Sequence, residues 1–356
     1  MSEAPEVPEE ESASRGPELL LEEASPEALM RLYAERGWGD GLPLVPPTAD
    51  RVERMLGDAP DPDAVVATLP PRFGVATRRI LAVNAVLAGC EPAHFEVLVA
   101  AVRGLARPEL NLRGVNATTH PVAPLLIVHG AAVAEGGFNA GLGTFGPGNR
   151  ANASVGRALR LVLLHVAGAR PGDGDASTQG QPSKYAYCIA ENTEASPWET
   201  YPRSRGLESA SAITLHCGEN PHNFHDMESD EPGPILDKAA SVMATLGPNN
   251  APVSSAEFFV VLGPEHAATI AGCGWSRRDV QSYLFERARL PAGAFRDAFD
   301  VVQYRPWLKA LEDDDLMPIT DHPDNIRLLV AGGPGKHSCV IPSWGMTKSV
   351  TLPLEG

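Results

Sequence analysis

The feature of this sequence that most constrains its fold is a repeated order of predicted elements. Each half of the chain carries a helical pattern, a short apolar run, a glycine-containing turn, a further helix and more apolar runs. The predicted strands are 125–128, 185–190 and 212–215 in the first half, with counterparts at 258–262, 326–331 and 349–352. This repetition predicts an α/β fold of two related halves about a pseudo-twofold axis, with a pocket at their seam. The alternative is chance similarity, because short apolar runs are common.

Composition shifts divide the chain into four predicted parts. Residues 1–24 form an acidic tail that we expect to be disordered, because it offers little apolar surface to bury. Residues 25–76 hold a helix that starts at Ser25-Pro26 and ends at Gly37, then a proline-rich extended strap. A second short helix capped by Thr48 and a linker that continues to Pro71 follow. The first α/β half is predicted at 77–230 and the second at 231–356.

A glycine-rich segment at 136–148 leads directly into a helical pattern. The helix start carries bare backbone amides and a favourable dipole for an anion, and two arginines lie within its first turns. The sequence therefore predicts a cradle for a carboxylate or phosphate, built from Asn149, Arg150, Asn152 and Arg157. The alternative is a tight loop whose glycines only supply positive φ. The spacing matches neither a dinucleotide nor a phosphate-loop fingerprint, and no flavin motif is readable, so no nucleotide or flavin is implied.

A polar cluster follows the third predicted strand. His216, Cys217, His222 and His225 place four possible metal ligands within ten residues. Imidazole and thiolate suit zinc, although the spacing is not that of a zinc finger. A general acid or base role for His222 and an ordinary loop histidine are the alternatives.

Further candidates for chemistry stand next to predicted strands. His120 precedes the first strand of the first half, Glu191 follows the second strand, and Lys336 and His337 follow the corresponding strand of the second half. A Lys or His held near a carboxylate can transfer a proton, and a surface Lys in a glycine turn is the alternative. Asn192 and Asn223 are further candidates for substrate binding.

Charge and cysteine content limit the partners and the compartment. The formal net charge of −16 repels nucleic acid and anionic membranes. Five scattered cysteines form no CxxC pair, so a reducing cytoplasm is expected, with Cys188 buried and inert and Cys90, Cys273 and Cys339 as packing residues. No apolar run is long enough to span a membrane. These features are compatible with assembly into a homo-oligomer.

Several longer motifs resemble a known bacterial family. They are WGDGLPLVPPT, NATTHPVAPLLIVHG, FGPGNRANASVGRALRL, KYAYCIAENTEASPW and AGGPGKHS. Over residues 36–356 the chain is similar to the portion that accompanies the UGSC-type (seleno)protein domain. The U/C-G-S-C motif itself is absent, so the redox unit of those proteins cannot be assigned to any residue of this chain.

Three functional hypotheses follow. The first is a small-molecule enzyme with lyase or hydrolase chemistry, in which a histidine acts as general acid or base on a compact anionic substrate at the seam. The second, implied by the resemblance, is a reductase-type enzyme or subunit that works with a separate thiol or selenol protein. The third is a non-catalytic ligand-binding subunit. A divalent metal such as zinc is the one cofactor that the residues suggest.

Overall fold

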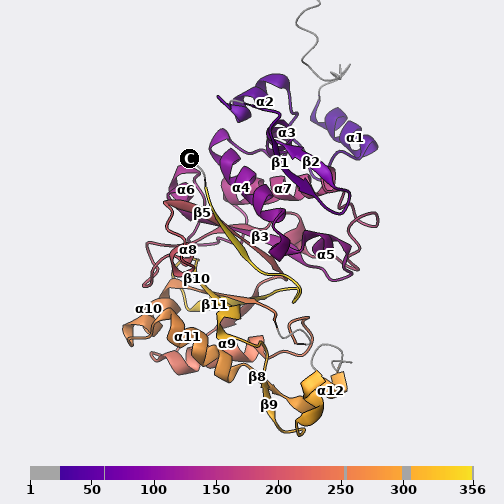
Figure 1. Ribbon diagram of the computed structural model, residues 1–356. Coiled ribbons are helices and arrows are strands. Elements are labelled where there is room, and N and C mark those ends of the chain that lie inside the picture. The colour runs from indigo at the N-terminus through magenta and orange to yellow at the C-terminus, as the bar shows by residue number, and fades with distance from the viewer. Residues whose placement is uncertain (1–24, 60, 252–254, 299–305, 355–356) are drawn as a thin grey trace, which may run out of the picture. The chain divides into compact units, whose positions relative to one another are not determined.

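The computed structural model describes residues 25–59, 61–251, 255–298 and 306–354 (Figure 1). The chain divides into two compact units, residues 1–44 and residues 45–356. The tail predicted at 1–24 lies outside the described residues. Both predicted α/β halves belong to the second unit, so their packing against each other can be followed within it.

The first unit contains one described helix, α1 (Pro26–Arg36). It begins where the sequence predicts, because the Ser25 hydroxyl oxygen accepts a hydrogen bond from the Ala28 amide at 3.2 Å and Pro26 occupies the first helical position. It ends at Gly37, whose φ of 62° is left-handed. Residues 38–48, which cross into the second unit, form no helix, as their prolines require.

The second unit begins with α2 (Ala49–Leu56) and a hairpin of β1 (Val65–Leu69) and β2 (Gly74–Thr77). The short helix predicted after Thr48 is confirmed as α2, whereas the linker predicted from there to Pro71 was wrong. The run Val65–Leu69 pairs antiparallel with β2 and buries Ala67 and Leu69 on one face. The prolines on both sides of this run indicated a linker, although buried and exposed residues alternate within it.

Two four-stranded sheets form the centre of the second unit, which is therefore mixed α/β. The first sheet has the order β12, β5, β3, β4, and the second has the order β6, β11, β7, β10. In each, one pair is parallel, β3 with β4 and β7 with β10, and the other pairs are antiparallel. The strands of the first sheet are β3 (Ala123–Gly130), β4 (Cys188–Ala190), β5 (Ser211–Gly218) and β12 (Val350–Pro353). Those of the second are β6 (His222–His225), β7 (Phe258–Leu262), β10 (Ile326–Val330) and β11 (His337–Pro342).

Each sheet receives its edge strand from the other half of the chain. Strand β12 comes from the C-terminal half and pairs with β5, with Val350 opposite Leu215. Strand β6 comes from the N-terminal half and pairs with β11, with His225 opposite His337. The segments 212–215 and 349–352, which the sequence analysis aligned as equivalents, are thus largely hydrogen-bonded neighbours.

Helices cover the outer faces of the two sheets (Figure 1). On the first sheet, α4 packs on β5 and β12, and α7 packs on β4; on the second, α9 packs on β6 and β11, and α11 packs on β10. The helices of the first half are α3 (Arg78–Ala88), α4 (Phe95–Leu105), α5 (Leu112–Ala117), α6 (Ala131–Glu135), α7 (Arg150–His165) and α8 (Tyr201–Ser204). Those of the second half are α9 (Pro232–Met243), α10 (Pro264–Gly272), α11 (Arg277–Arg287) and α12 (Ala292–Ala298), with a small hairpin of β8 (Arg289–Pro291) and β9 (Leu316–Pro318).

The inner faces of the two sheets pack against each other through alternate residues of their strands. Leu125 and Ile127 of β3 share a buried cluster with Phe259 and Val261 of β7 and with Leu329 of β10. Because strand side chains alternate between faces, the residues that continue these rows also point into the seam between the sheets. Several of them are polar, and they define the candidate site.

Candidate functional site

Arg327 is the most unusual residue of the seam. It is the second residue of β10, inside the run Ile-Arg-Leu-Leu-Val, and its place in the strand puts it on the inner face with Leu329. Only 9% of its surface is exposed. Its Nη2 donates to Glu257 Oε1 at 2.7 Å, whereas Nε and Nη1 are buried without a hydrogen-bond partner. Leaving charged donors buried and unpaired is costly, so this arrangement requires an explanation beyond packing.

Two further arginines begin α11. Arg277 and Arg278 follow the N-cap Ser276, where the helix dipole disfavours cations. Arg277 donates to the carbonyl oxygens of Leu328 and, at 2.7 Å, Glu199, and its Nε is buried without a partner. Burial lowers the pKa of Arg277 from its ordinary value, and the nearby Glu191 partly offsets this. The Asp279 carboxylate of the capping box provides some compensation for the positive charge at this helix end.

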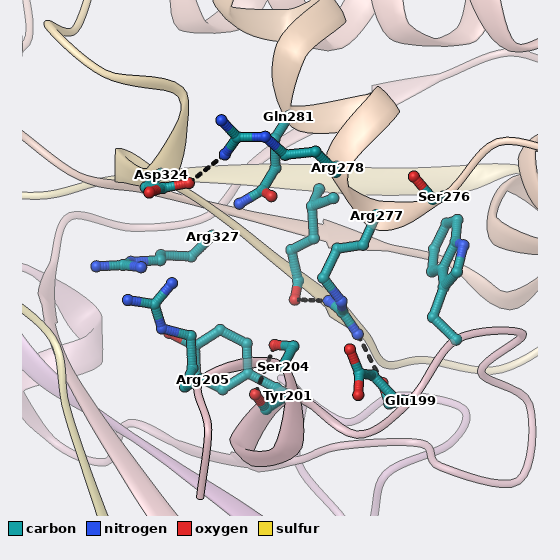
Figure 2. A pocket seen from close by; sticks show the side chains of 12 residues that line it. Glu199, Tyr201, Ser204, Arg205, Ser276, Arg277, Arg278, Gln281, Asp324 and Arg327 are labelled. Atoms are coloured by element: carbon teal, nitrogen blue, oxygen red, sulfur yellow. Dashed lines mark hydrogen bonds and ion pairs between the residues drawn. The ribbon is translucent and has the colours of Figure 1, made fainter.

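These arginines line a cavity of about 590 Å³, which we call the arginine pocket (Figure 2). Its walls come from the segment 198–205, from the start of α11 and from residues 324–328, so both halves of the chain contribute. Arg205 completes the set of four guanidinium groups, against the lining carboxylates of Glu199 and Asp324. Asp324 is already paired with Arg278. The pocket therefore carries an excess of positive groups on its walls.

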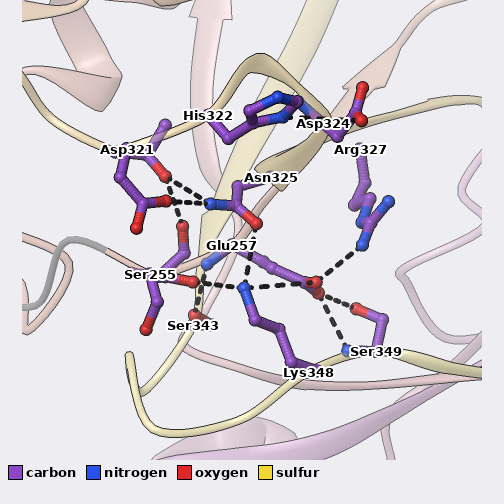
Figure 3. Close-up of polar contacts among 12 residues, drawn as sticks. Ser255, Glu257, Asp321, His322, Asp324, Asn325, Arg327, Ser343, Lys348 and Ser349 are labelled. Carbon is purple, nitrogen blue, oxygen red and sulfur yellow. Dashed lines mark hydrogen bonds and ion pairs between the residues drawn. The ribbon is translucent and has the colours of Figure 1, made fainter.

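A network of buried polar side chains holds the Arg327 guanidinium in place (Figure 3). The fully buried Glu257 accepts from Arg327, from the Ser349 amide at 2.8 Å and from the Ser349 hydroxyl at 2.6 Å. Burial raises the pKa of Glu257, but Arg327 and the Ser349 hydrogen bonds outweigh it and leave the pKa below its ordinary value. Lys348 lies beside this carboxylate and donates to Asn325 Oδ1 at 2.9 Å. Glu257 is thus ionised and holds the guanidinium in one orientation.

Tyr201 forms another wall of the pocket. It is the first residue of α8, and its ring packs against Phe259 at 5.3 Å and stacks on His129 at 5.7 Å between centroids. Burial raises the pKa of Tyr201 to about 12, although the charges of Arg327, Arg205 and Arg277 act in the opposite direction. The phenol is therefore protonated at neutral pH and can donate a hydrogen bond or a proton.

A chain of buried hydrogen bonds crosses the first sheet next to Tyr201. Glu191 accepts from His129 at 2.7 Å, His129 is bonded to Thr214 at 2.9 Å, and Thr214 is bonded to Thr351 at 3.0 Å. The other oxygen of Glu191 accepts from the Tyr201 amide at 2.7 Å. The predicted site residue Glu191 thus anchors the helix that carries Tyr201, and it lies behind the pocket wall.

Side chains of the predicted glycine-rich cradle form hydrogen bonds with nearby groups of the protein. Asn149 caps α7 and accepts from the Asn152 amide, and its side chain also donates to Gly137 O at 3.0 Å. The buried Asn152 bonds both backbone groups of Asn139. Arg150 donates to Gly89 O at 3.0 Å and is paired with Glu91, while Arg157 is half-buried on α7. These contacts favour the structural alternative, and none of the four cradle residues lines the arginine pocket.

The structure places the other predicted residues at several separate positions. His120 is bonded to Glu219 at 2.9 Å, and Lys336 donates to Met227 O at 3.1 Å. His222, Asn223 and His225 are exposed on β6, where Asn223 bonds His337 at 3.1 Å. Asn192 bonds Gly332 O at 3.1 Å at the ends of β4 and β10. None of these residues lines the arginine pocket.

The four predicted metal ligands do not converge. His216 and Cys217 are successive residues of β5, so their side chains point to opposite faces of the sheet, while His222 and His225 lie on β6 of the other sheet. The sequence interpretation of 216–226 as one polar loop cluster was wrong, because β5 extends to Gly218 and β6 begins at His222. Among the described residues, no group of three or more His, Cys, Asp or Glu is arranged to hold a metal ion.

Four of the five thiols are buried, and burial raises the pKa of Cys90, Cys188, Cys217 and Cys339 above the ordinary value. Such thiols are poor nucleophiles. Cys273 is exposed at the end of α10, so the expectation that it is a packing residue was wrong.

Sequence reasoning missed the residues that form the pocket. Two signals were available: a charged residue inside an otherwise apolar strand at Arg327, and paired arginines in the first turn of a helix at 277–278. Tyr201 and Arg205 gave no comparable signal, because they follow a proline-containing turn and no helix or strand was predicted there against which a charged residue would stand out.

No family model matches the chain, and no curated protein matches its sequence significantly. Within the described ranges, no helix combines the length and the apolar character needed to cross a membrane.

Proposed function

We propose that this protein is an enzyme of small-molecule metabolism that binds a compact anionic substrate in the arginine pocket and acts on it by lyase- or hydrolase-type chemistry. The observation that carries the proposal is the state of Arg327, a nine-tenths buried guanidinium with two unpaired nitrogens on the wall of a cavity. A bound anion would supply the missing acceptors. Charge-assisted hydrogen bonds of this kind are the strong ones in proteins.

In this proposal the pocket residues have distinct roles. Arg277 and Arg327 hold the anionic group and stabilise negative charge that develops in the reaction. Tyr201 donates the proton, in place of the histidines predicted from the sequence, because its phenol is protonated and lines the pocket. Glu257 and Glu191 act through these residues and position them.

The pocket lies where the proposed repeat would put it. We infer that the two halves are related by a pseudo-twofold axis, in which β3, β4, β5 and β6 correspond to β7, β10, β11 and β12, so that 212–215 corresponds to part of β11 and not to 349–352. The shared strand order and the shared pattern of parallel and antiparallel pairs support this correspondence. We further propose a cytoplasmic location, which free thiols favour.

Isothermal titration with a panel of small carboxylates and phosphates tests the binding part of the proposal. The change Arg277→Gln should weaken binding of the best anion by about 10- to 100-fold, the loss expected for a hydrogen bond to a charged group. Arg203→Gln is the matched control, because Arg203 belongs to α8 but pairs with the exposed Glu208 instead of lining the pocket. Equal affinities in wild type and Arg277→Gln would refute the proposed site.

Turnover is tested separately. Any small molecule that remains bound through purification would be identified by mass spectrometry and incubated with wild-type protein and with Tyr201→Phe. We expect Tyr201→Phe to lower turnover by about 10²- to 10⁴-fold with a smaller change in affinity. Tight binding without conversion by the wild-type protein would instead favour the ligand-binding subunit.

A further inference from the structure

We infer that the anionic group held in the arginine pocket is the tetrahedral phosphoryl group of a phosphate monoester or of free phosphate, bound by Arg205, Arg277 and Arg327 around the Tyr201 hydroxyl. This inference rests on the proposed function and narrows its substrate class. It concerns the shape of the bound group and the size of its charge, not only the sign of that charge.

The three guanidinium groups come from three different elements. Arg205 follows α8 in the first half, Arg277 begins α11, and Arg327 lies on β10. All three line the same cavity, and the charges of all three act on the Tyr201 phenol. Figure 2 shows their side chains entering the pocket from separate parts of its wall. The donors therefore surround Tyr201 from several directions and do not form one flat array.

This distribution discriminates between oxyanions. A carboxylate has two oxygens in one plane, and one guanidinium fork can satisfy it in a bidentate pair. A phosphoryl group presents three oxygens around a tetrahedral centre, so it can accept from donors that approach from different sides. Clusters of arginines from separate elements are a recurring means of recognising phosphate.

The charge of the pocket also favours a phosphoryl group over a carboxylate. Arg278 is neutralised by Asp324, and Arg327 by Glu257. Arg277 is bonded to carbonyl oxygens, and among the described side chains none forms a hydrogen bond or ion pair with the Arg205 guanidinium. Glu199 is drawn on the other side of Arg277 from Arg205 (Figure 2), and the remaining lining carboxylate, Asp324, is already paired with Arg278. A monoester with about two negative charges at pH 7 would match the two arginines that lack carboxylate partners.

Titration calorimetry with four probes tests this inference: inorganic phosphate, glycerol 3-phosphate, succinate and acetate. We expect both phosphates to bind at least about 10-fold more tightly than succinate, and acetate to bind weakest. Affinity for glycerol 3-phosphate should rise between pH 5.5 and pH 7.5, because the second proton of a phosphate monoester leaves with a pKa of about 6, whereas succinate should show a smaller change over that range. Tighter binding of glycerol 3-phosphate than of inorganic phosphate assigns an organic monoester, and the reverse order assigns free phosphate.

Two exposed arginines supply the mutational test without disturbing the core. Arg205→Gln should lower phosphate affinity by about 10- to 100-fold, and Arg203→Gln should leave it unchanged. Phosphate affinity that is unaffected by Arg205→Gln, or succinate binding more tightly than both phosphates, would overturn the phosphoryl assignment while leaving an anion pocket in place. Failure of all four probes to bind would overturn the proposed function as well.

Discussion

His216 should make this protein lose stability as the pH falls below neutrality. The side chain is 1% exposed on the inner face of β5, and burial lowers its pKa from 6.5 to about 4. Its Nδ1 donates to the Ser349 hydroxyl at 3.0 Å, since that hydroxyl gives its own hydrogen to Glu257. Its Nε2 is buried without a partner, so the folded protein keeps the imidazole neutral.

The sign and size of the effect follow from proton linkage. Because the folded pKa lies below the unfolded one, the unfolded chain binds the extra proton first as the pH falls below about 6.5. Stability from this group is complete above about pH 6.5 and is lost progressively down to about pH 4. A shift of about 2.5 pKa units corresponds to roughly 3 kcal/mol in total, of which about 2 kcal/mol falls between pH 7 and pH 5.

Urea unfolding of wild type and His216→Gln at pH 7 and pH 5 measures this contribution. Glutamine can still donate to Ser349 but does not titrate, so the variant should lose about 2 kcal/mol less than wild type between the two pH values. His222→Gln, which removes an exposed histidine from β6, is the control and should keep the wild-type pH dependence. Equal losses in wild type and His216→Gln would refute the reasoning, because other groups would then account for the whole effect.

Two further substitutions test the roles assigned to buried polar groups. Glu257→Gln removes the carboxylate that pairs with the buried Arg327 and should lower the free energy of unfolding by about 3–5 kcal/mol in urea titrations at pH 7; a loss under about 1 kcal/mol would mean that Arg327 finds another partner. Asn152→Ala deletes side-chain hydrogen bonds to Asn139 and Thr144 and should cost about 1–3 kcal/mol without changing anion affinity in calorimetry. Weaker anion binding with unchanged stability would instead restore the glycine-rich cradle as the site.

Local signals in the sequence predicted single elements well. The start and end of α1 follow from a serine cap, a proline and a glycine, and β7 occupies the predicted apolar run Phe258–Leu262. The helix after Asn149 was also expected, because apolar residues at helical spacing follow the glycine-rich segment. In each case the information lies within a few neighbouring residues.

Pairing between distant segments was not predictable in the same way. Strand β6 reads His-Asn-Phe-His, which has too few apolar residues to indicate a strand, and it forms because β11 supplies its hydrogen bonds. The register of β12 against β5 joins residues about 140 positions apart. The predicted ligands His216 and His225 were assigned to one cluster because they are close in sequence, whereas the fold places them in different sheets.

The candidate site depends on the same long-range pairing. Tyr201 and Arg205 come from the first half, whereas Arg277 and Arg327 come from the second, so neither half contains the pocket alone.

The exchanged strand β12 brings Ser349 beside His216 and Glu257, and Glu257 in turn holds Arg327 on the pocket wall. Without the pairing of β12 with β5, Ser349 would not be held beside Glu257, and the carboxylate would lose two of its hydrogen bonds although every residue of the pocket would still be present. The buried arginine is therefore positioned by the strand exchange, so the charged residue inside an apolar run at 327 signals a buried arginine but not the pocket that it lines.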